Sequence, residues 1–188
     1  ADCEIELALK SDIFAFNCES IQEVEVINAL AQSQNKTANI CIRVNPNIDA
    51  QTHKYISTGQ FDDKFGISIS DVELFMRDKL HNLTNINIFG LHYHIGSQIL
   101  NYDVFRDLAE TANKHVAQLS GLGVSIQHLN FGGGVGIDYD DPKSNPIVCF
   151  ADYFSEISRH FDFKNSMTIH FELGGSLVGQ AGVLLSKV

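Results

Sequence analysis

The chain alternates short apolar runs with longer amphipathic stretches, and this order constrains its fold more than any other feature. The apolar runs are rich in Ile, Val and Phe, as β-strands are, and they lie at residues 13–18, 38–45, 86–95, 126–131 and 167–172. The stretches between them have the apolar spacing of helices and lie at residues 20–34, 70–82, 101–122 and 147–163. Strands that alternate with helices form a parallel sheet, so the sequence predicts an α/β fold.

The spacing of the later strands favours a barrel over an open sheet. From Ile86 to Ile126 is 40 residues and from Ile126 to Met167 is 41, a regular strand-plus-helix repeat. A complete (β/α)8 barrel takes about 250 residues, whereas this chain has 188 residues. We therefore expect residues 1–180 to be the C-terminal part of a TIM barrel whose first strands are missing, with a helix at residues 1–10. Residues 181–188 then start a β segment that leads to a missing C-terminal β domain.

Two of the predicted helices open with a capping box, Ser20 with Glu23 and Ser70 with Glu73. In this motif the hydroxyl and the carboxylate satisfy free backbone N–H groups at the start of a helix. The pattern predicts that the helices begin at these serines.

Charge and composition exclude several classes of partner. The net charge of −10 and the absence of a Lys/Arg cluster argue against nucleic acid. No apolar stretch approaches the roughly 20 residues of a membrane span, and no basic region precedes a long apolar run as in a signal peptide, so we expect a cytoplasmic protein. The four cysteines show no CxxC pair, and we expect reduced, apolar fillers and no metal site: Cys3, Cys18, Cys41 and Cys149.

Polar side chains recur on one face of the predicted strands. If Leu91, Tyr93 and Ile95 point outward to the helices, then His92 and His94 point into the barrel lumen. The same alternation turns further polar residues inward: Arg43, Asn45, His128, Asn130, His170 and Glu172. Lumens are usually filled by Val, Ile and Leu, and buried polar groups are costly without partners. The pattern predicts a ligand site at the C-terminal ends of the strands.

Each of these residues also has a structural interpretation. For His92 and His128, a hydrogen-bonded core histidine is the favoured one. His94 differs because Gly96 and Ser97 follow it at the strand end. Arg43 is as well explained by a structural ion pair with Glu172 as by a ligand role.

Two glycine-rich loops favour a phosphorylated ligand. Gly132, Gly133, Gly134 and Gly136 follow one strand directly, and Gly174, Gly175 and Ser176 follow the next. Bare backbone N–H groups in such loops can surround an anion. If the last strand is the eighth, these are the two loops that bind phosphate in many barrels.

Four segments carry a family resemblance: "IRVNPNIDAQTHKYISTGQFDDKFGI", "GLHYHIGSQI", "LNFGGGVGIDY" and "ELGGSLVGQAGVLLSKV". In this order they resemble the diaminopimelate decarboxylases, pyridoxal-phosphate enzymes of the alanine-racemase-like barrel group. The resemblance implies an N-terminal barrel, a C-terminal β domain, a homodimer, and conversion of meso-diaminopimelate to L-lysine and CO2.

The resemblance also implies roles for individual residues. Glu172 pairs with the ring nitrogen of the cofactor and keeps it protonated, so that the ring can act as an electron sink. His94 stacks on the ring, and Arg43 lies near its substituents. The implied cofactor-binding residues are Arg43, His94, Ser97, Gly133, Gly134, Glu172, Gly174, Gly175 and Ser176.

The sequence departs from the family at two points. Glu172-Leu173-Gly174-Gly175 stands where the family has Glu-Pro-Gly-Arg, and no lysine of this chain has the Val-Lys-Ala-Asn-like setting of the Schiff-base lysine. No catalytic residue is therefore identified within the chain. Two alternatives stay open: a decarboxylase of another basic amino acid, and an inactive homologue that binds a partner or has a structural role.

Overall fold

The structure of the chain is a computed structural model that describes residues 1–48, 65–141, 144, 148–163, 167–183 and 185–187. Its five strands form one parallel sheet in the order β1-β2-β3-β4-β5, so that each strand pairs with the next one along the chain. They are β1 (Phe16–Cys18), β2 (Ala38–Arg43), β3 (Ile86–His92), β4 (His128–Asn130) and β5 (Thr168–His170). The predicted α/β fold with a parallel sheet is confirmed, although each strand is shorter than its apolar run.

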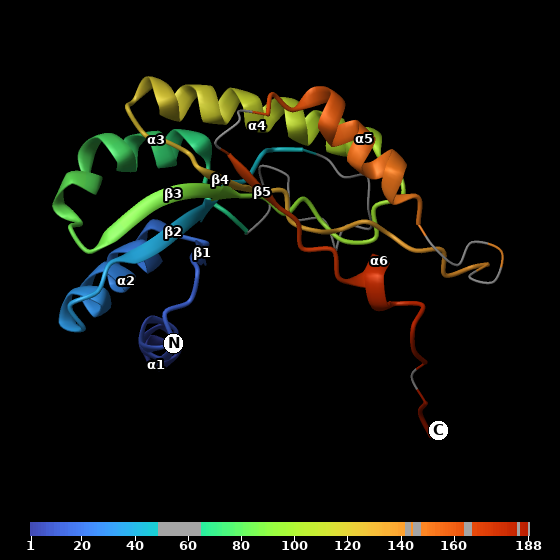
Figure 1. Cartoon of the computed structure of the whole chain (residues 1–188), viewed down its shortest axis with the longest axis horizontal. Coiled ribbons are helices and arrows are strands. Elements are labelled where there is room, and N and C mark those ends of the chain that lie inside the picture. The colour runs from blue at the N-terminus through green and yellow to red at the C-terminus, as the bar shows by residue number, and fades with distance from the viewer. Residues whose placement is uncertain (49–64, 142–143, 145–147, 164–166, 184, 188) are drawn as a thin grey trace.

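Helices alternate with these strands (Figure 1). They are α1 (Asp2–Lys10), α2 (Ile21–Ser33), α3 (Ile69–Asp78), a short 3-10 turn η1 (Leu80–Asn82), α4 (Asp103–Gly121), α5 (Phe150–His160) and α6 (Gly175–Val178). In Figure 1, α3, α4 and α5 lie along one side of the strands. The helix predicted at residues 1–10 is confirmed, residue 147 lies outside the described part, and α6 was not predicted.

The two predicted capping boxes have different outcomes. Ser20 is the N-cap of α2, and its side chain accepts from the backbone N–H of Glu23 as predicted, whereas the Glu23 carboxylate accepts the backbone N–H of Glu19 and not that of Ser20. The box at Ser70 is wrong, because α3 begins two residues earlier with Ser68 as its N-cap. There Ser68 Oγ accepts the backbone N–H of Asp71 at 3.1 Å.

The apolar core lies between the sheet and the helices. Leu91, Tyr93 and Ile95 are fully buried in it together with Ile40 and Ile42 of β2. Because side chains alternate along an extended chain, this burial places His92, the last residue of β3, on the other side of the sheet.

A bulge in β3 sets which of its residues face inward. Ile88 pairs with Ile40 and Gly90 pairs with Cys41, so Phe89 is an extra residue without a partner in the ladder. Before the bulge Asn87 shares a face with Asn39, and after it His92 shares that same face with Arg43. Because Asn87 and His92 are an odd number of residues apart, strict alternation would have placed them on opposite faces.

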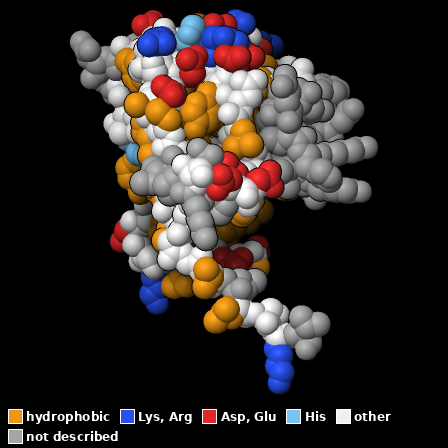
Figure 2. Space-filling model, turned by 90° about the vertical axis from the view of Figure 1, so that its right-hand side faces the viewer, with side chains coloured by type: hydrophobic (Ala, Val, Ile, Leu, Met, Phe, Trp, Pro, Cys, Tyr) orange, Lys and Arg blue, Asp and Glu red, His pale blue; other side chains and the backbone are white. Residues whose placement is uncertain are grey.

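The C-terminal segment extends away from the rest of the molecule (Figure 2). Its apolar side chains are exposed: Leu177, Val178, Val183 and Leu185. Residues 181–183 and 185–187 contain no strand, so the β segment expected there is not observed in the described residues. A strand requires a neighbouring strand for its backbone hydrogen bonds, and none of the described residues supplies one to this segment.

Two further expectations concern the cysteines and the membrane. Cys18 and Cys41 are buried fillers as predicted, whereas Cys3 and Cys149 are exposed, so the prediction was wrong for them. Among the described helices, none combines the length and apolar character that crossing a membrane requires.

Candidate functional site

The carboxylate of Glu172 is the centre of a polar cluster at the C-terminal ends of the strands. Its Oε2 lies 3.1 Å from His92 Nε2 at the end of β3. Its Oε1 accepts the side-chain amides of Asn130, at the end of β4, at 2.8 Å and of Asn17, in β1, at 3.3 Å. Donors from β1, β3 and β4 are therefore directed at Glu172, which follows β5.

These contacts keep Glu172 ionised. The hydrogen bond from His92 is the main cause that lowers the pKa of Glu172 to about 2, with further contributions from the His92 charge, Asn130 and His94, while partial burial opposes the shift. A carboxylate that stays charged at neutral pH can hold a proton on a basic ring nitrogen.

His94 lies two residues beyond the end of β3 and is suited to a neutral role. Burial, followed by the charge of Arg43, lowers the pKa of its imidazole. Its Nδ1 lies 3.4 Å from the backbone N–H of Gly133, which ties the end of β3 to the first glycine loop. An uncharged imidazole can stack on an aromatic ring.

Arg43 does not form the ion pair with Glu172 that the sequence left open. Its guanidinium pairs instead with Glu19 and donates to the backbone oxygen of His94 at 3.4 Å, and it lies over the ring of Phe65. Its side chain is 11% exposed. Arg43 therefore supports the backbone below His94 and does not line the hollow beside Glu172.

The first glycine loop is packed directly against the neighbouring loops. A Cβ on Gly132 would overlap the backbone oxygen of Tyr93, and a Cβ on Gly133 would overlap that of Glu172. Gly134 has a φ of +104°, and a Cβ there would overlap the oxygen of Gly96. Only glycine permits these approaches, which place backbone N–H groups beside the polar cluster.

Gln98 joins the loop after β3 to the first glycine loop, which follows β4, through its side-chain amide. Its Oε1 accepts the backbone N–H of Ile137 at 3.1 Å, and its Nε2 donates to the Ile137 oxygen. The backbone bonds from Ile99 N to Gly134 O and from Gly136 N to Ile99 O continue this pairing. The amide thus acts like one more backbone unit between the loops, although Gln98 itself has a φ of +59°.

A hollow of about 350 Å³ opens beside this cluster. Its lining comes from the ends of β3, β4 and β5: His94, Ser97, Gln98, Gly134, Val135, Tyr139, Glu172, Gly174 and Gly175. Ser176 follows in α6, and its Oγ is buried without a hydrogen-bond partner among the described residues. Six of the nine predicted cofactor-binding residues therefore line one hollow, while Gly133 and Ser176 are neighbours of its lining.

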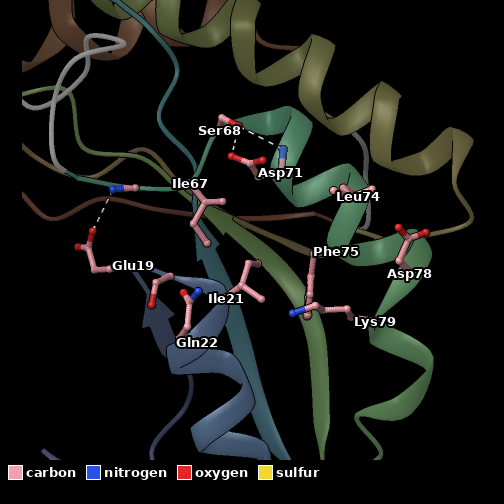
Figure 3. A pocket seen from close by; sticks show the side chains of 12 residues that line it. Glu19, Ile21, Gln22, Ile67, Ser68, Asp71, Leu74, Phe75, Asp78 and Lys79 are labelled. Atoms are coloured by element: carbon pink, nitrogen blue, oxygen red, sulfur yellow. Dashed lines mark hydrogen bonds between the residues drawn. The ribbon is translucent and has the colours of Figure 1, made fainter.

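A larger hollow of about 470 Å³ lies elsewhere, between the start of α2 and helix α3 (Figure 3). Several of its polar groups are bonded to one another or to the backbone: Glu19 accepts from Gly66 N, and Ser68 bonds Asp71. Its lining has a single glycine and no set of donors directed at one carboxylate, so we place the functional site at Glu172.

Sequence reasoning missed three members of the cluster. His92 was favoured as a core histidine, yet it bonds Glu172, whereas His128 does bond another histidine, with its Nδ1 2.9 Å from His170 Nε2. Asn17 and Gln98 were not singled out. The position of Asn17 in its strand was the only available signal, and none pointed to the side-chain pairing of Gln98.

Comparison with known proteins finds a family and named relatives for this chain. Residues 2–179 match the family described as pyridoxal-dependent decarboxylase, pyridoxal binding domain. The diaminopimelate decarboxylase of Bacteroides thetaiotaomicron is 44% identical over 188 residues, which are 100% of this chain and 48% of that protein. The enzyme of the same name from Aquifex aeolicus is 37% identical over 186 residues, which are 98% of this chain and 43% of that protein.

Solved structures give the same result. The crystal structure of diaminopimelate decarboxylase from Helicobacter pylori complexed with L-lysine is similar with a TM-score of 0.85 at 33% identity, over 94% of this chain and 44% of that one. This similarity confirms the predicted α/β fold as part of an alanine-racemase-like barrel. The chain spans about half the length of the curated relatives that it matches.

Proposed function

Because the chain belongs to the pyridoxal-dependent decarboxylases through their pyridoxal-binding domain, we propose that it is the cofactor-holding part of a diaminopimelate decarboxylase. The reaction is the decarboxylation of meso-diaminopimelate to L-lysine and CO2, a step of lysine biosynthesis. The observation that carries the proposal is the ionised Glu172, held by donors from three strands beside two glycine loops.

The described residues fit pyridoxal phosphate. A hollow of about 350 Å³ suits a small cofactor, because small-molecule pockets typically have volumes of about 300–1,000 Å³. The buried Ser176 Oγ lacks a partner among the described residues, and a phosphate oxygen would supply one. The close-packed Gly133 and Gly134 offer backbone donors on the other side of the hollow.

Each residue has a defined task in this proposal. The cofactor, when bound, would supply an electron sink for the electron pair left on the substrate carbon when CO2 departs. Glu172 would hold the proton on the ring nitrogen, and His94 would pack against the ring. Ser97, Gly133, Gly134, Gly174 and Ser176 would hold the phosphate, with Gly175 beside them, while Arg43 supports the backbone of His94.

The proposal extends to the whole protein. Residues 1–180 form part of the barrel, and residues 181–188 begin the connection to a C-terminal β domain that covers the exposed apolar side chains of this segment. We also propose a cytoplasmic homodimer. Sedimentation of the full-length protein and cell fractionation test these two points.

The experiment is steady-state decarboxylation by the full-length protein with pyridoxal phosphate and meso-diaminopimelate, with L-lysine as the measured product. Glu172→Gln should lower kcat by at least about 100-fold, because a neutral amide cannot keep the ring nitrogen protonated. A positioned acid or base group typically contributes a rate factor of about this size. Cofactor binding should change much less.

The matched control is Glu6→Gln, which makes the same change on the exposed side of α1. Full turnover by Glu172→Gln would refute the role of the carboxylate. Lysine or arginine as the preferred substrate would favour the related decarboxylase, and failure with every basic amino acid would favour an inactive homologue, which the replacement of the family arginine by Gly175 would explain.

A further inference from the structure

The donors around Glu172 differ in how easily water can replace them. Asn17 and Asn130 approach Oε1, in a carboxylate whose side chain is 43% exposed, and Asn17 itself is exposed. His92 approaches the other oxygen, Oε2, and its own side chain is only 7% exposed. Water can take the place of an exposed donor, whereas the loss of a buried donor leaves the acceptor unpaired.

The surroundings of His92 also fix which of its nitrogens carries the proton. Its Nδ1 is buried without a hydrogen-bond partner among the described residues. A proton on Nδ1 would be an unpaired buried donor, and the bare Nε2 would then face a carboxylate oxygen. In the neutral imidazole, the proton therefore lies on Nε2, where it is donated to Glu172.

We propose that His92 is a positioning residue, whose buried Nε2–H is a fixed donor to Glu172 Oε2 that orients the carboxylate and keeps it charged. This role deepens the proposed function and rests on it in one respect, namely that Glu172 pairs with the protonated ring of the cofactor. The bulge at Phe89 is required for this contact, because it turns His92 to the face of the sheet on which Glu172 lies.

The other groups around Glu172 do not supply the same donor. On β2, Cys41 is a buried thiol whose pKa is raised to about 12, first by burial and then by the charge of Glu172, so it stays neutral. His94 makes the smallest of the contributions to the low pKa of Glu172, and its Nδ1 lies 3.4 Å from the backbone nitrogen of Gly133. Asn17 and Asn130 are neutral amides, and the amide of Asn130 is also fixed by the Gly132 N–H at 2.8 Å.

The test is a pH titration of the Glu172 carboxyl in the full-length protein without cofactor. Glutamate labelled with ¹³C at Cδ gives the signal, and its disappearance in Glu172→Gln gives the assignment. In His92→Phe, which keeps the ring but removes the donor, the pKa of Glu172 should rise by at least about one unit. His92→Ala should give the same shift and serves if the phenyl ring prevents folding.

Two matched variants complete the experiment. His92→Gln retains an N–H donor and should restore most of the wild-type pKa, whereas Asn17→Ala removes an exposed donor and should leave the pKa of Glu172 nearly unchanged. An unchanged pKa in both donor-free variants, or a rise in Asn17→Ala as large as in His92→Phe, would overturn the proposal.

The loaded enzyme adds a second measurement. The long-wavelength absorbance of the bound cofactor should shift its pH dependence in His92→Phe in the same direction as the Glu172 titration. If wild type shows no decarboxylation while the cofactor-free titration behaves as expected, the proposed function fails and the role of His92 in holding Glu172 stands. If decarboxylation is observed but the titration is flat, only the role of His92 fails.

Discussion

Gly132 gives the sharpest test of how the glycine loop is built, through the substitution Gly132→Ala. The residue has a φ of +70°, a region that costs an alanine about 1–2 kcal/mol. The new Cβ would also overlap the Tyr93 oxygen and come within 3.2 Å of the His94 Cα, so the loops must separate. Overpacking of this kind costs about 1–3 kcal/mol. Together these effects predict a loss of about 2–5 kcal/mol in the free energy of unfolding.

The matched control is Gly175→Ala, because a Cβ there meets nothing within 4 Å. Its effect should stay within about 0.5 kcal/mol of wild type. The assay is urea unfolding of the full-length protein without cofactor, monitored by far-UV circular dichroism. The unfolding free energies are compared with the same dependence on urea concentration for each variant. If Gly132→Ala and Gly175→Ala unfold at the same urea concentration, the close packing of the loop does not stabilise the fold and our reasoning is refuted.

Two further predictions concern the family departure and a buried histidine. Gly175→Arg has room for its side chain and should tighten cofactor or substrate binding by about 1–3 kcal/mol, because a guanidinium adds charge-assisted hydrogen bonds. Cofactor titration and kcat/KM check this, with Leu173→Pro added to restore the turn, and improvement in neither quantity contradicts it. Burial lowers the pKa of His115 to about 4 from an ordinary 6.5, so the unfolded chain binds its proton first as the pH falls. The contribution of His115 to the free energy of unfolding should therefore be fully present above pH 6.5 and be lost as the pH falls from 6.5 to 4. Urea unfolding of wild type and His115→Gln across this range measures the effect, and equal pH profiles of the two proteins would contradict it.

The order of elements and most of the site follow from local sequence, because each depends on neighbouring residues. Apolar runs and helical spacing predicted five strands and the helices between them. The outward burial of Leu91, Tyr93 and Ile95 follows from simple alternation after Gly90. Glycines that follow a strand directly also predicted the first loop, because only glycine tolerates the positive φ and the backbone approaches found there.

What the sequence could not determine depends on contacts between distant segments. The start of α3 at Ser68, where Ser70 had the stronger local pattern, is one example, since Ile67 pairs with Val44 and brings the chain to the sheet just before that serine. The partner of Arg43 is another, because Glu19 and Glu172 are both acids and only their positions in space choose between them.

The clearest case is the pairing of His92 with Glu172, which lie 80 residues apart. Alternation counted from Ile86 would have placed His92 on the helix-facing side, and only the extra residue Phe89 in the ladder returns it to the inner face. A bulge forms because the register with the neighbouring strands requires it, and this register is a property of the assembled sheet. Local sequence therefore determined that a polar site would form at the strand ends, and tertiary structure decided which donors hold its carboxylate.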